Sequence, residues 1–381
     1  MSASKPVTIC SVGDLMICDS PLYASIGVGS NYNHIRQSLF AHCKSAFNAA
    51  DIVIGNFETV VHQPRNRSLT EKQMCCSEQV IIDLKEAGFS VLNLANNHCM
   101  QHGTEGFEQT RMACKTNGIQ PIGIRDEEPF FCDIRGVKIA MLSLCIHLEW
   151  YDPEHIRYED RIERIIRSVA QLREQDEKLV IIVSVHWGDE FADYPSNAQI
   201  ALAHRLVDCG ADVLLGHHPH VVQGTEQYKN SLIVYSLGNF VSDMVPEMCR
   251  QTGIVSVRIE PSEDGKKISY DWRPLRIGDD FVPVPAEGDW LSHRQETLVQ
   301  ALHGAYTDDD YWQAVSRNHR LAHNSFKDYF QRNLGKYNPA ISSKMLAEFV
   351  GRKVKRILGT STDGRVSSMD SAIYQALKDT E

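Results

Sequence analysis

The chain has 381 residues, of which 43% are hydrophobic, so it can bury one large core or two smaller ones. Its formal net charge is -10 at pH 7, which makes nucleic-acid backbones and anionic lipids unfavourable partners. Eleven cysteines without a CxxC pair indicate reduced thiols, and no apolar run reaches the roughly 18 residues that span a bilayer. We therefore expect a cytoplasmic protein with no nucleic-acid or membrane partner.

Short β-branched runs alternate with longer helical segments as far as about residue 240, which predicts a sheet covered by helices. The predicted strands are residues 7–12, 52–55, 91–94, 136–144, 179–185, 213–215 and 232–236. Apolar residues at helical spacing predict helices at 79–87 and 198–207. Ser196 is the expected N-cap of the second helix, and Gly210 follows its end.

The pattern changes after the last of these strands. Residues 254–259 and 267–272 flank a polar turn and predict an antiparallel pair that closes the sheet. The Pro-rich connection 281–285 ends the strand pattern. From about residue 288 the chain holds no strand candidate and predicts three or four amphipathic helices, with breaks near 308–310, 335–339 and 359–364. We therefore divide the chain into a domain at residues 1–282 and an α-helical extension at 283–381.

The C-terminal helices have three candidate roles. They can cover the core, close over a site as a lid, or join copies of the chain into a homo-oligomer. Covering the core is the plainest role because it needs no partner. Five basic residues suggest one further helix with a solvated face rather than a polyanion site: Lys344, Arg352, Lys353, Lys355 and Arg356.

Polar side chains collect just past the C-terminal ends of the predicted strands, where open α/β sheets bind their ligands. Five strands are followed in this way by Gly13-Asp14, by Asn56-Phe57-Glu58, by Asn96-Asn97-His98, by His186-Trp187-Gly188 and by Gly216-His217-His218-Pro219-His220. Carboxylate, amide and imidazole groups in one cleft form a ligand set suited to divalent Zn, Mn, Fe, Ni or Co. The sequence therefore predicts a metal site at this end of the sheet.

Each of these motifs taken alone also has a plain structural explanation as a turn, a cap or packed core. The last motif is the strongest, because three imidazoles within residues 217–220 repel one another when charged and are hard to bury without a partner. Metal ligation supplies that partner. The histidines at four other positions lack a comparable setting and are expected on the surface or in ordinary core: His62, His102, His147 and His204.

In this order the motifs resemble the CapA (PgsA-like) poly-γ-glutamate capsule synthesis proteins, within the calcineurin-like metallophosphoesterase superfamily. The resemblance covers about residues 7–277 and includes the run Tyr235-Ser236-Leu237-Gly238-Asn239-Phe240. It implies an α/β fold in which a β-sandwich is flanked by helices, with the helical extension behind it. It also implies one or two divalent ions and a hydrolase acting on a small or polymeric phosphoester in capsule or polymer biosynthesis.

The resemblance implies ligands for two ions. Asp14 and His220 would bind one of them. Asn97, His186 and His218 would bind the other.

The remaining roles follow from the same resemblance. Either Asn56 or Glu58 would stand between the two ions, and Glu58 is our choice because it carries charge. His98 is the expected general acid. Glu190 would shape the substrate pocket or orient a metal-binding imidazole. Asn239 would shape the pocket or cap a turn.

Two positions depart from the superfamily pattern. Met16 stands where an imidazole ligand is usual, which predicts one tight ion and one weak one. Gln101 stands where an aspartate is usual, so a carboxylate that steadies His98 is expected from elsewhere. These departures keep a second hypothesis open, that of a non-catalytic polymer-synthesis or binding subunit. A third is metal-dependent hydrolysis of γ-glutamyl amides, because the same activated water can attack a carbonyl.

Overall fold

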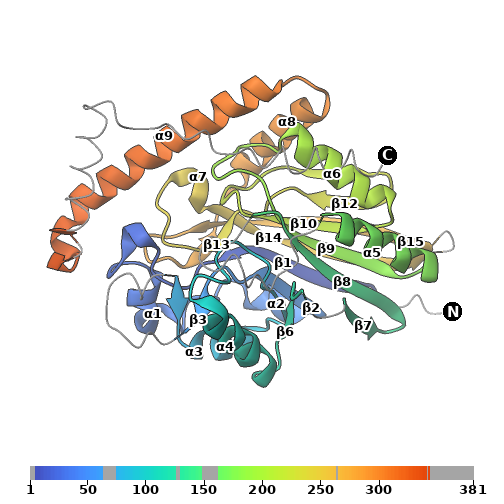
Figure 1. Ribbon diagram of the computed structural model, residues 1–381, viewed down its shortest axis with the longest axis horizontal. Coiled ribbons are helices and arrows are strands. Elements are labelled where there is room, and N and C mark those ends of the chain that lie inside the picture. The colour runs from blue at the N-terminus through green and yellow to red at the C-terminus, as the bar shows by residue number, and fades with distance from the viewer. Residues whose placement is uncertain are drawn as a thin grey trace.

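The computed structural model describes residues 5–62, 74–125, 129–147, 162–262, 265–340 and 342–343. Two β-sheets face each other, and helices cover the outer face of each (Figure 1). The first sheet contains, in spatial order, β16 (Pro283–Pro285), β15 (Gly265–Ile277), β14 (Gln251–Ser262), β1 (Val7–Leu15), β2 (Ile52–Asn56), β5 (Val91–Asn93) and β6 (Gln120–Ile122), and β13 (Asn239–Val241) also pairs with β1. The second contains β11 (Thr225–Tyr228), β12 (Ser231–Val234), β10 (Val213–His217), β9 (Val180–His186), β8 (Val137–Cys145) and β7 (Phe130–Ile134). A separate short pair joins β3 (Val60–Val61) and β4 (Cys75–Cys76).

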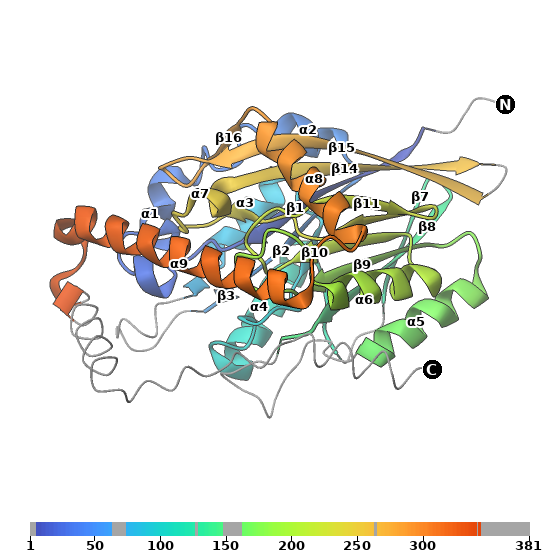
Figure 2. The same cartoon turned by 90° about the horizontal axis from the view of Figure 1, so that it is seen from above.

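The helices form two outer layers. The layer on the first sheet contains α1 (Val28–Ile35), α2 (Lys44–Ala49), α3 (Gln79–Ala87) and α4 (Gly103–Thr116). The layer on the second sheet contains α5 (Ile162–Gln175), α6 (Asn197–Asp208) and α8 (Asp289–Leu302). Shorter elements are η1 (Pro21–Tyr23), α7 (Glu247–Arg250) and η2 (Leu334–Lys336), and the long α9 (Asp308–Asn333) runs along one side of the sandwich (Figure 2). The α/β sandwich flanked by helices, predicted from the sequence, is confirmed.

Alternation along the strands builds the central core. Ile52 and Ile54 of β2 pack between the sheets, whereas Val53 between them packs against the helices. Successive side chains of a strand point to opposite faces, so an uninterrupted apolar run is buried on both sides. Ile181 and Ile182 of β9 divide in the same way between the helical layer and the core between the sheets.

Most predicted elements are present, but several strands are longer than predicted. The helix at 79–87 is confirmed and ends at Gly88, whose φ of 112° closes the helix in the left-handed region. Ser196 caps α6 as predicted, in a capping box with Gln199. β1, β2, β9 and β10 extend far enough to include Asp14, Asn56, His186 and His217. These polar residues therefore end the strands rather than follow them.

The C-terminal part differs from the prediction at two places. Pro283–Pro285 forms an edge strand on β15 where the sequence predicted only a connection, and an edge is where a sheet tolerates proline. The predicted break at 308–310 is the first turn of α9, because Thr307 caps the helix and acidic residues favour a helix N-terminus.

Three further predictions about this part have different outcomes. The break at 335–339 is confirmed, since α9 ends before it. The break at 359–364 and the basic residues from Lys344 to Arg356 lie outside the described residues. The domain boundary between residues 282 and 283 stays a prediction. None of the helices in the described ranges has the length and apolar character needed to cross a membrane.

Candidate metal centre

The register of the parallel strands sets polar residues side by side at one end of each sheet. In the first sheet Asp14 lies opposite Asn56, and Asn56 lies opposite Asn93 of β5. In the second sheet His186 of β9 lies opposite His217 of β10. All five side chains are buried. Strands far apart in the sequence thus deliver carboxylate, amide and imidazole groups to the same end of the sandwich.

Two glycines let the backbones approach closely beside these residues. A Cβ atom on Gly13 would lie 1.9 Å from the carbonyl oxygen of Gly238. A Cβ atom on Gly216 would lie 1.9 Å from that of Tyr235. Any other residue at either position would force the strands apart next to Asp14 and the histidine turn.

The turn that carries the last two histidines has an unusual backbone. His218 has a φ of 97° and His220 a φ of 58°, on either side of Pro219. Non-glycine residues in such conformations cost of order 1–3 kcal/mol each and persist only where the surroundings impose them. The end of β1 provides such surroundings, since the backbone N–H of His218 lies 3.4 Å from Asp14 Oδ2 and His220 Nδ1 lies 3.2 Å from the same oxygen.

Two overlapping groups of side chains have the spacing of a metal site. Glu58, His186 and His218 form one group, and Asp14, Glu58 and His220 form the other. Within each group the potential ligand atoms lie within 4.8 Å of one another. Every member is buried, and Glu58 belongs to both groups.

The first group extends to Asn97. His186 Nε2 lies 2.9 Å from Asn97 Oδ1 and 3.1 Å from His218 Nδ1. Ligands about 2.1 Å from one ion and at right angles to each other are separated by about 3 Å, so these distances suit a common ion. Burial and the neighbouring His147 lower the pKa of both His186 and His218 well below the usual value. Both imidazoles are therefore neutral, which is the form that binds metals.

The second group is a cluster of charges. His220 Nδ1 lies 3.2 Å from Asp14 Oδ2 and 2.9 Å from Asn239 Oδ1. Burial opposes the charge on His220, but Glu58 and Asp14 outweigh it and raise its pKa to about 10 in the metal-free protein. Binding of a cation to this imidazole would therefore release a proton. Burial likewise opposes the charge on Asp14, but His217 and His220 outweigh it and hold its pKa below the usual value. Asp14 is thus an ionised carboxylate in the interior.

The environment of the Glu58 carboxyl group indicates that the two ligand groups fit a cation. Its side chain is fully buried, and its Oε1 accepts no hydrogen bond from the described residues. His98 Nε2 and His220 Nε2 lie 3.9 and 3.8 Å from this oxygen, beyond hydrogen-bonding distance. Burial and the charge of Asp14 raise the pKa of Glu58 well above its usual value. A buried carboxylate oxygen without a partner is costly, and a divalent cation between the two groups would satisfy it.

Asn56 has a supporting role in this arrangement. Its Nδ2 donates to Asp14 Oδ1 at 2.8 Å and to Glu58 Oε2 at 3.3 Å. Its Oδ1 accepts from Asn93 Nδ2 at 3.0 Å. The reversed amide would set an oxygen against two carboxylates, so the hydrogen bonds themselves assign its orientation. Asn56 therefore orients the carboxylates, which supports Glu58 as the residue shared between two ions.

His98 lies at the edge of this centre and is 20% exposed. Its Nδ1 lies 2.7 Å from Gln101 Oε1, and its Nε2 faces Glu58. Gln101 itself thus holds the ring at Nδ1, and the carboxylate that faces its other nitrogen, at 3.9 Å, is that of Glu58. Burial lowers the pKa of His98, and the Gln101 hydrogen bond opposes this effect.

Glu190 is half-buried, and its negative charge acts on Glu58, His98 and His220. It was also expected to orient His186. Within the described part of the chain, the hydrogen-bonding contacts of the His186 ring are to Asn56, Asn97 and His218, with Nδ1 3.4 Å from Asn56 Nδ2. These contacts do not support the orienting role, and the role of Glu190 in the substrate pocket stays a prediction.

His147 was expected to be an ordinary residue, but the structure places it against the centre. Its ring centroid lies 3.7 Å from that of His218, and its Nε2 lies 3.1 Å from the carbonyl oxygen of Gly188. It comes two residues after the end of β8, so the strand-end rule used for the other motifs would have found it. Of the other histidines, His62 stacks on His102 and His204 contacts Glu226.

Asn239 and His217 also have more specific positions than the sequence predicted. Asn239 contacts His220 Nδ1, as described above, rather than only capping a turn. His217 Nδ1 lies 3.3 Å from Asp14 Oδ1. Each of these two residues thus contacts one member of the second ligand group, Asn239 contacting His220 and His217 contacting Asp14.

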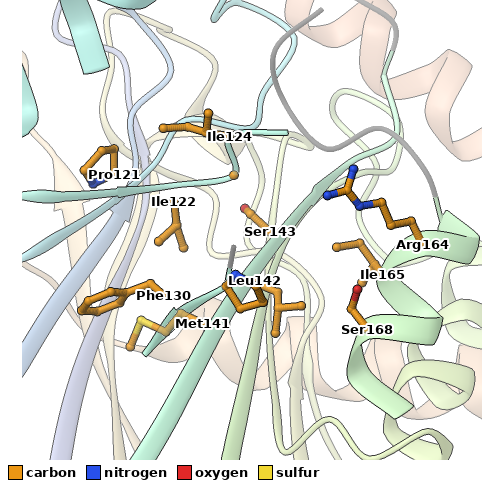
Figure 3. Close-up of a pocket in the computed structure, with 12 residues that line it drawn as sticks. Pro121, Ile122, Ile124, Phe130, Met141, Leu142, Ser143, Arg164, Ile165 and Ser168 are labelled. Carbon is orange, nitrogen blue, oxygen red and sulfur yellow. The ribbon is translucent and has the colours of Figure 1, made fainter. Parts of the chain in front are cut away.

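A separate cavity of about 60 Å³ lies between β6, β8 and α5 (Figure 3). Figure 3 shows Ile122 and Leu142 from the sheets and Ile165 from α5 around it. It has room for about two water molecules. Its lining contains none of the predicted site residues, so it is separate from the candidate metal centre.

Solved structures with distant sequences resemble this chain. The NAD nucleotidase of Haemophilus influenzae is 12% identical, with a TM-score of 0.39 over 84% of this chain and 60% of that one. A 5'-nucleotidase precursor from Thermus thermophilus is 11% identical, with a TM-score of 0.40 over 78% of this chain and 59% of that one. The chain spans about three fifths of the length of each.

Sequence relatives are much closer. The capsule biosynthesis protein CapA of Bacillus anthracis is 31% identical over 72% of this chain and 68% of its own length. The PGA biosynthesis protein CapA of Bacillus subtilis is 28% identical over 70% of this chain and 71% of its own length. Residues 8–244 match the family described as bacterial capsule synthesis protein PGA_cap. This range contains every predicted ligand and the general-acid candidate, and the chain belongs to the PGA_cap family.

Proposed function

We propose that this protein is a metal-dependent phosphoesterase that acts in the synthesis of a capsule or related polymer. One observation carries the proposal: two groups of buried ligands share Glu58, whose Oε1 accepts no hydrogen bond from the described residues. This geometry suits two divalent ions at adjacent positions. The names of the relatives support the connection with capsule or poly-γ-glutamate synthesis.

The side chains of the site have separable tasks. Ions bound there would lower the pKa of a water molecule and clamp the oxygens of a phosphoryl group. Asp14 and His220 would hold one ion, and Asn56 orients the carboxylates for it. His98 would donate a proton from Nε2 to the leaving oxygen, while Gln101 holds the ring through Nδ1.

Reconstitution tests the proposal. The protein is freed of metal, loaded separately with Mn²⁺, Co²⁺, Ni²⁺ or Zn²⁺, and assayed with mono- and bis-aryl phosphates. We expect turnover that requires metal and reaches its plateau at no more than two equivalents. Less than one bound equivalent together with no phosphoester turnover would contradict the proposal. Zn²⁺, Mn²⁺, Fe²⁺, Ni²⁺ and Co²⁺ all suit this mixture of nitrogen and oxygen ligands, so the identity of the metal is a result of this experiment.

A second candidate function is a polymer-synthesis or binding subunit that does not catalyse. Met16 favours it, because this thioether stands two residues after Asp14 where the superfamily has an imidazole ligand. A relative from Mycobacterium tuberculosis, 26% identical, is named a probable polyglutamine synthesis accessory protein. Binding of poly-γ-glutamate without turnover of any phosphoester would favour this function. Cleavage of γ-glutamyl oligomers in the same assay would indicate amide hydrolysis instead.

A further inference from the structure

The loop between β9 and α6 joins the C-terminal helices to the candidate metal centre. We propose that Asn318 of α9 is a positioning residue, which fixes this loop and, through it, the turn His218-Pro219-His220. The inference rests on the proposed function and deepens it, since it makes the helical extension a part of the site. Figure 1 shows α9 crossing the molecule from the side of α8 to the side of α1.

Asn318 is a polar side chain buried between α9 and the loop. It is 3% exposed, and its Nδ2 donates to the carbonyl oxygen of Phe191 at 2.9 Å and to Asp193 Oδ2 at 2.8 Å. The second oxygen of Asp193 accepts from Arg294 of α8 at 2.6 Å. Buried amides are retained where their hydrogen bonds are satisfied, and here both acceptors belong to the loop.

The loop passes this constraint to the histidine turn. The backbone N–H of Phe191 donates to the carbonyl oxygen of Pro219 at 2.8 Å. The carbonyl oxygen of Phe191 therefore accepts a hydrogen bond from α9, while its N–H donates to Pro219, which lies between the two histidine ligands. Its own φ is 64°, and His218 and His220 also have positive φ values. Phe191 and the histidine turn, which meet at the Phe191–Pro219 hydrogen bond, both hold positive φ values that need outside support to persist, and Asn318 supplies it.

Packing also attaches α9 to this loop, so its contribution must be separated from that of hydrogen bonding. Ala192 and Tyr194 pack against Tyr311 and Val315 of α9. Asn318→Asp keeps the shape of the side chain but replaces the donor with an acceptor that faces Asp193. Because the volume of the side chain is kept, a change in this variant reports on the polar contact with Asp193 rather than on lost packing.

Hydrogen exchange in the metal-free protein tests the first step. We expect the Phe191 amide to exchange faster in Asn318→Ala and in Asn318→Asp than in the wild type. Val169→Ala, on the buried face of α5, controls for a general loss of stability. Asn333→Ala controls for changes to α9, because within the described ranges its side-chain amide donates inside that helix, to the carbonyl oxygen of Tyr329. Unchanged protection of Phe191 in both Asn318 variants overturns the inference.

Titration with Zn²⁺ or Mn²⁺ tests the second step. Residues that orient metal ligands typically change affinity by about 10- to 100-fold, and we expect this loss in both Asn318 variants but in neither control. Wild-type affinity in the Asn318 variants overturns the inference. A wild-type protein that binds neither ion would refute the proposed function, and the exchange experiment would then decide alone whether Asn318 positions the loop.

Discussion

At the residue scale, Glu58 determines what the centre can bind. The Glu58 carboxyl group is 0% exposed, and its Oε1 accepts no hydrogen bond from the described residues, so charging it in the metal-free protein is costly and its pKa is raised. The same charge becomes favourable when a cation shares it. Stability and metal binding are therefore opposed at this position.

We expect Glu58→Gln to leave the melting temperature of the metal-free protein unchanged or higher, because the amide is neutral and cannot carry the charge that burial and Asp14 disfavour at this position. The rise in melting temperature on adding metal should disappear. When the free metal concentration is 100 times the Kd of the wild-type protein, binding raises the free energy of unfolding by about 2.7 kcal/mol. Thermal melts with and without Zn²⁺ measure both effects. Glu226→Gln, in a pair with His204 outside the centre, should keep the metal-dependent rise.

His98 allows chemistry to be separated from metal binding. We expect His98→Ala to bind the same number of ions as the wild type, because Nε2 is 3.9 Å from Glu58 and the ring lies at the edge of the centre. Its kcat should fall by about 10²- to 10⁴-fold, the usual contribution of a general acid. Gln101→Ala should cause a smaller loss. A kcat equal to that of the wild type at full metal occupancy would refute the role.

At the element scale, ion pairs join helices that sequence periodicity cannot connect. Asp83 of α3 accepts from Arg36, which follows α1, at 2.8 Å, and from Tyr32 of α1. Burial raises the pKa of Asp83, but the hydrogen bonds from Arg36, Tyr32 and Gln79 outweigh it and lower the pKa below its usual value. The pair thus attaches α1 to α3 over the first sheet.

This depressed pKa predicts a pH dependence of stability. The folded state holds the Asp83 proton less tightly than the unfolded state, whose pKa is about 3.9. The contribution is therefore complete above that value and is lost as the pH falls through the lower folded-state pKa. Urea denaturation between pH 6 and pH 3 should show a shallower loss of stability in Asp83→Asn than in the wild type. Equal slopes would show that the carboxylate makes no such contribution.

At the scale of the whole molecule, the C-terminal helices belong to the same packed body as the sandwich. Leu298 of α8 has 0% exposure and packs in the core of the second sheet. Near the C-terminal end of α9, the rings of Phe326 and Tyr329 pack edge-on against Tyr23 in η1. Of the roles considered for these helices, covering the core is thus directly observed. Self-association into a homo-oligomer and a cytoplasmic location stay predictions.

We expect Leu298→Ala to destabilise the entire protein, by about 2–5 kcal/mol, because it opens a cavity in the main core. Leu321→Ala on α9 is the control, since this side chain is 54% exposed and should change stability by less than about 0.5 kcal/mol. Denaturation followed by circular dichroism and by tryptophan fluorescence should give one common transition. A separate early transition in Leu298→Ala would indicate that the helices unfold independently.

The local features of this protein could be predicted from its sequence. Apolar alternation, helical spacing and the Ser196 cap depend on residues near one another in the chain, so the strands and two helices were predictable. The sequence also predicted the type of site, because acidic, amide and imidazole side chains that gather at the strand ends of an α/β sheet commonly bind a ligand.

Which of these groups meet depends on how the chain packs in three dimensions. The strand register sets Asp14 beside Asn56, and the facing of the two sheets brings Glu58 to both pairs of ligands. The sequence did not predict that His147 and Asn318 lie near the site. His147 follows a strand end that was overlooked and contacts His218. Asn318 lies 127 residues beyond Phe191 and contacts it from α9. Contacts of this kind depend on how sheets and helices pack, which the spacing of residues along a chain does not record.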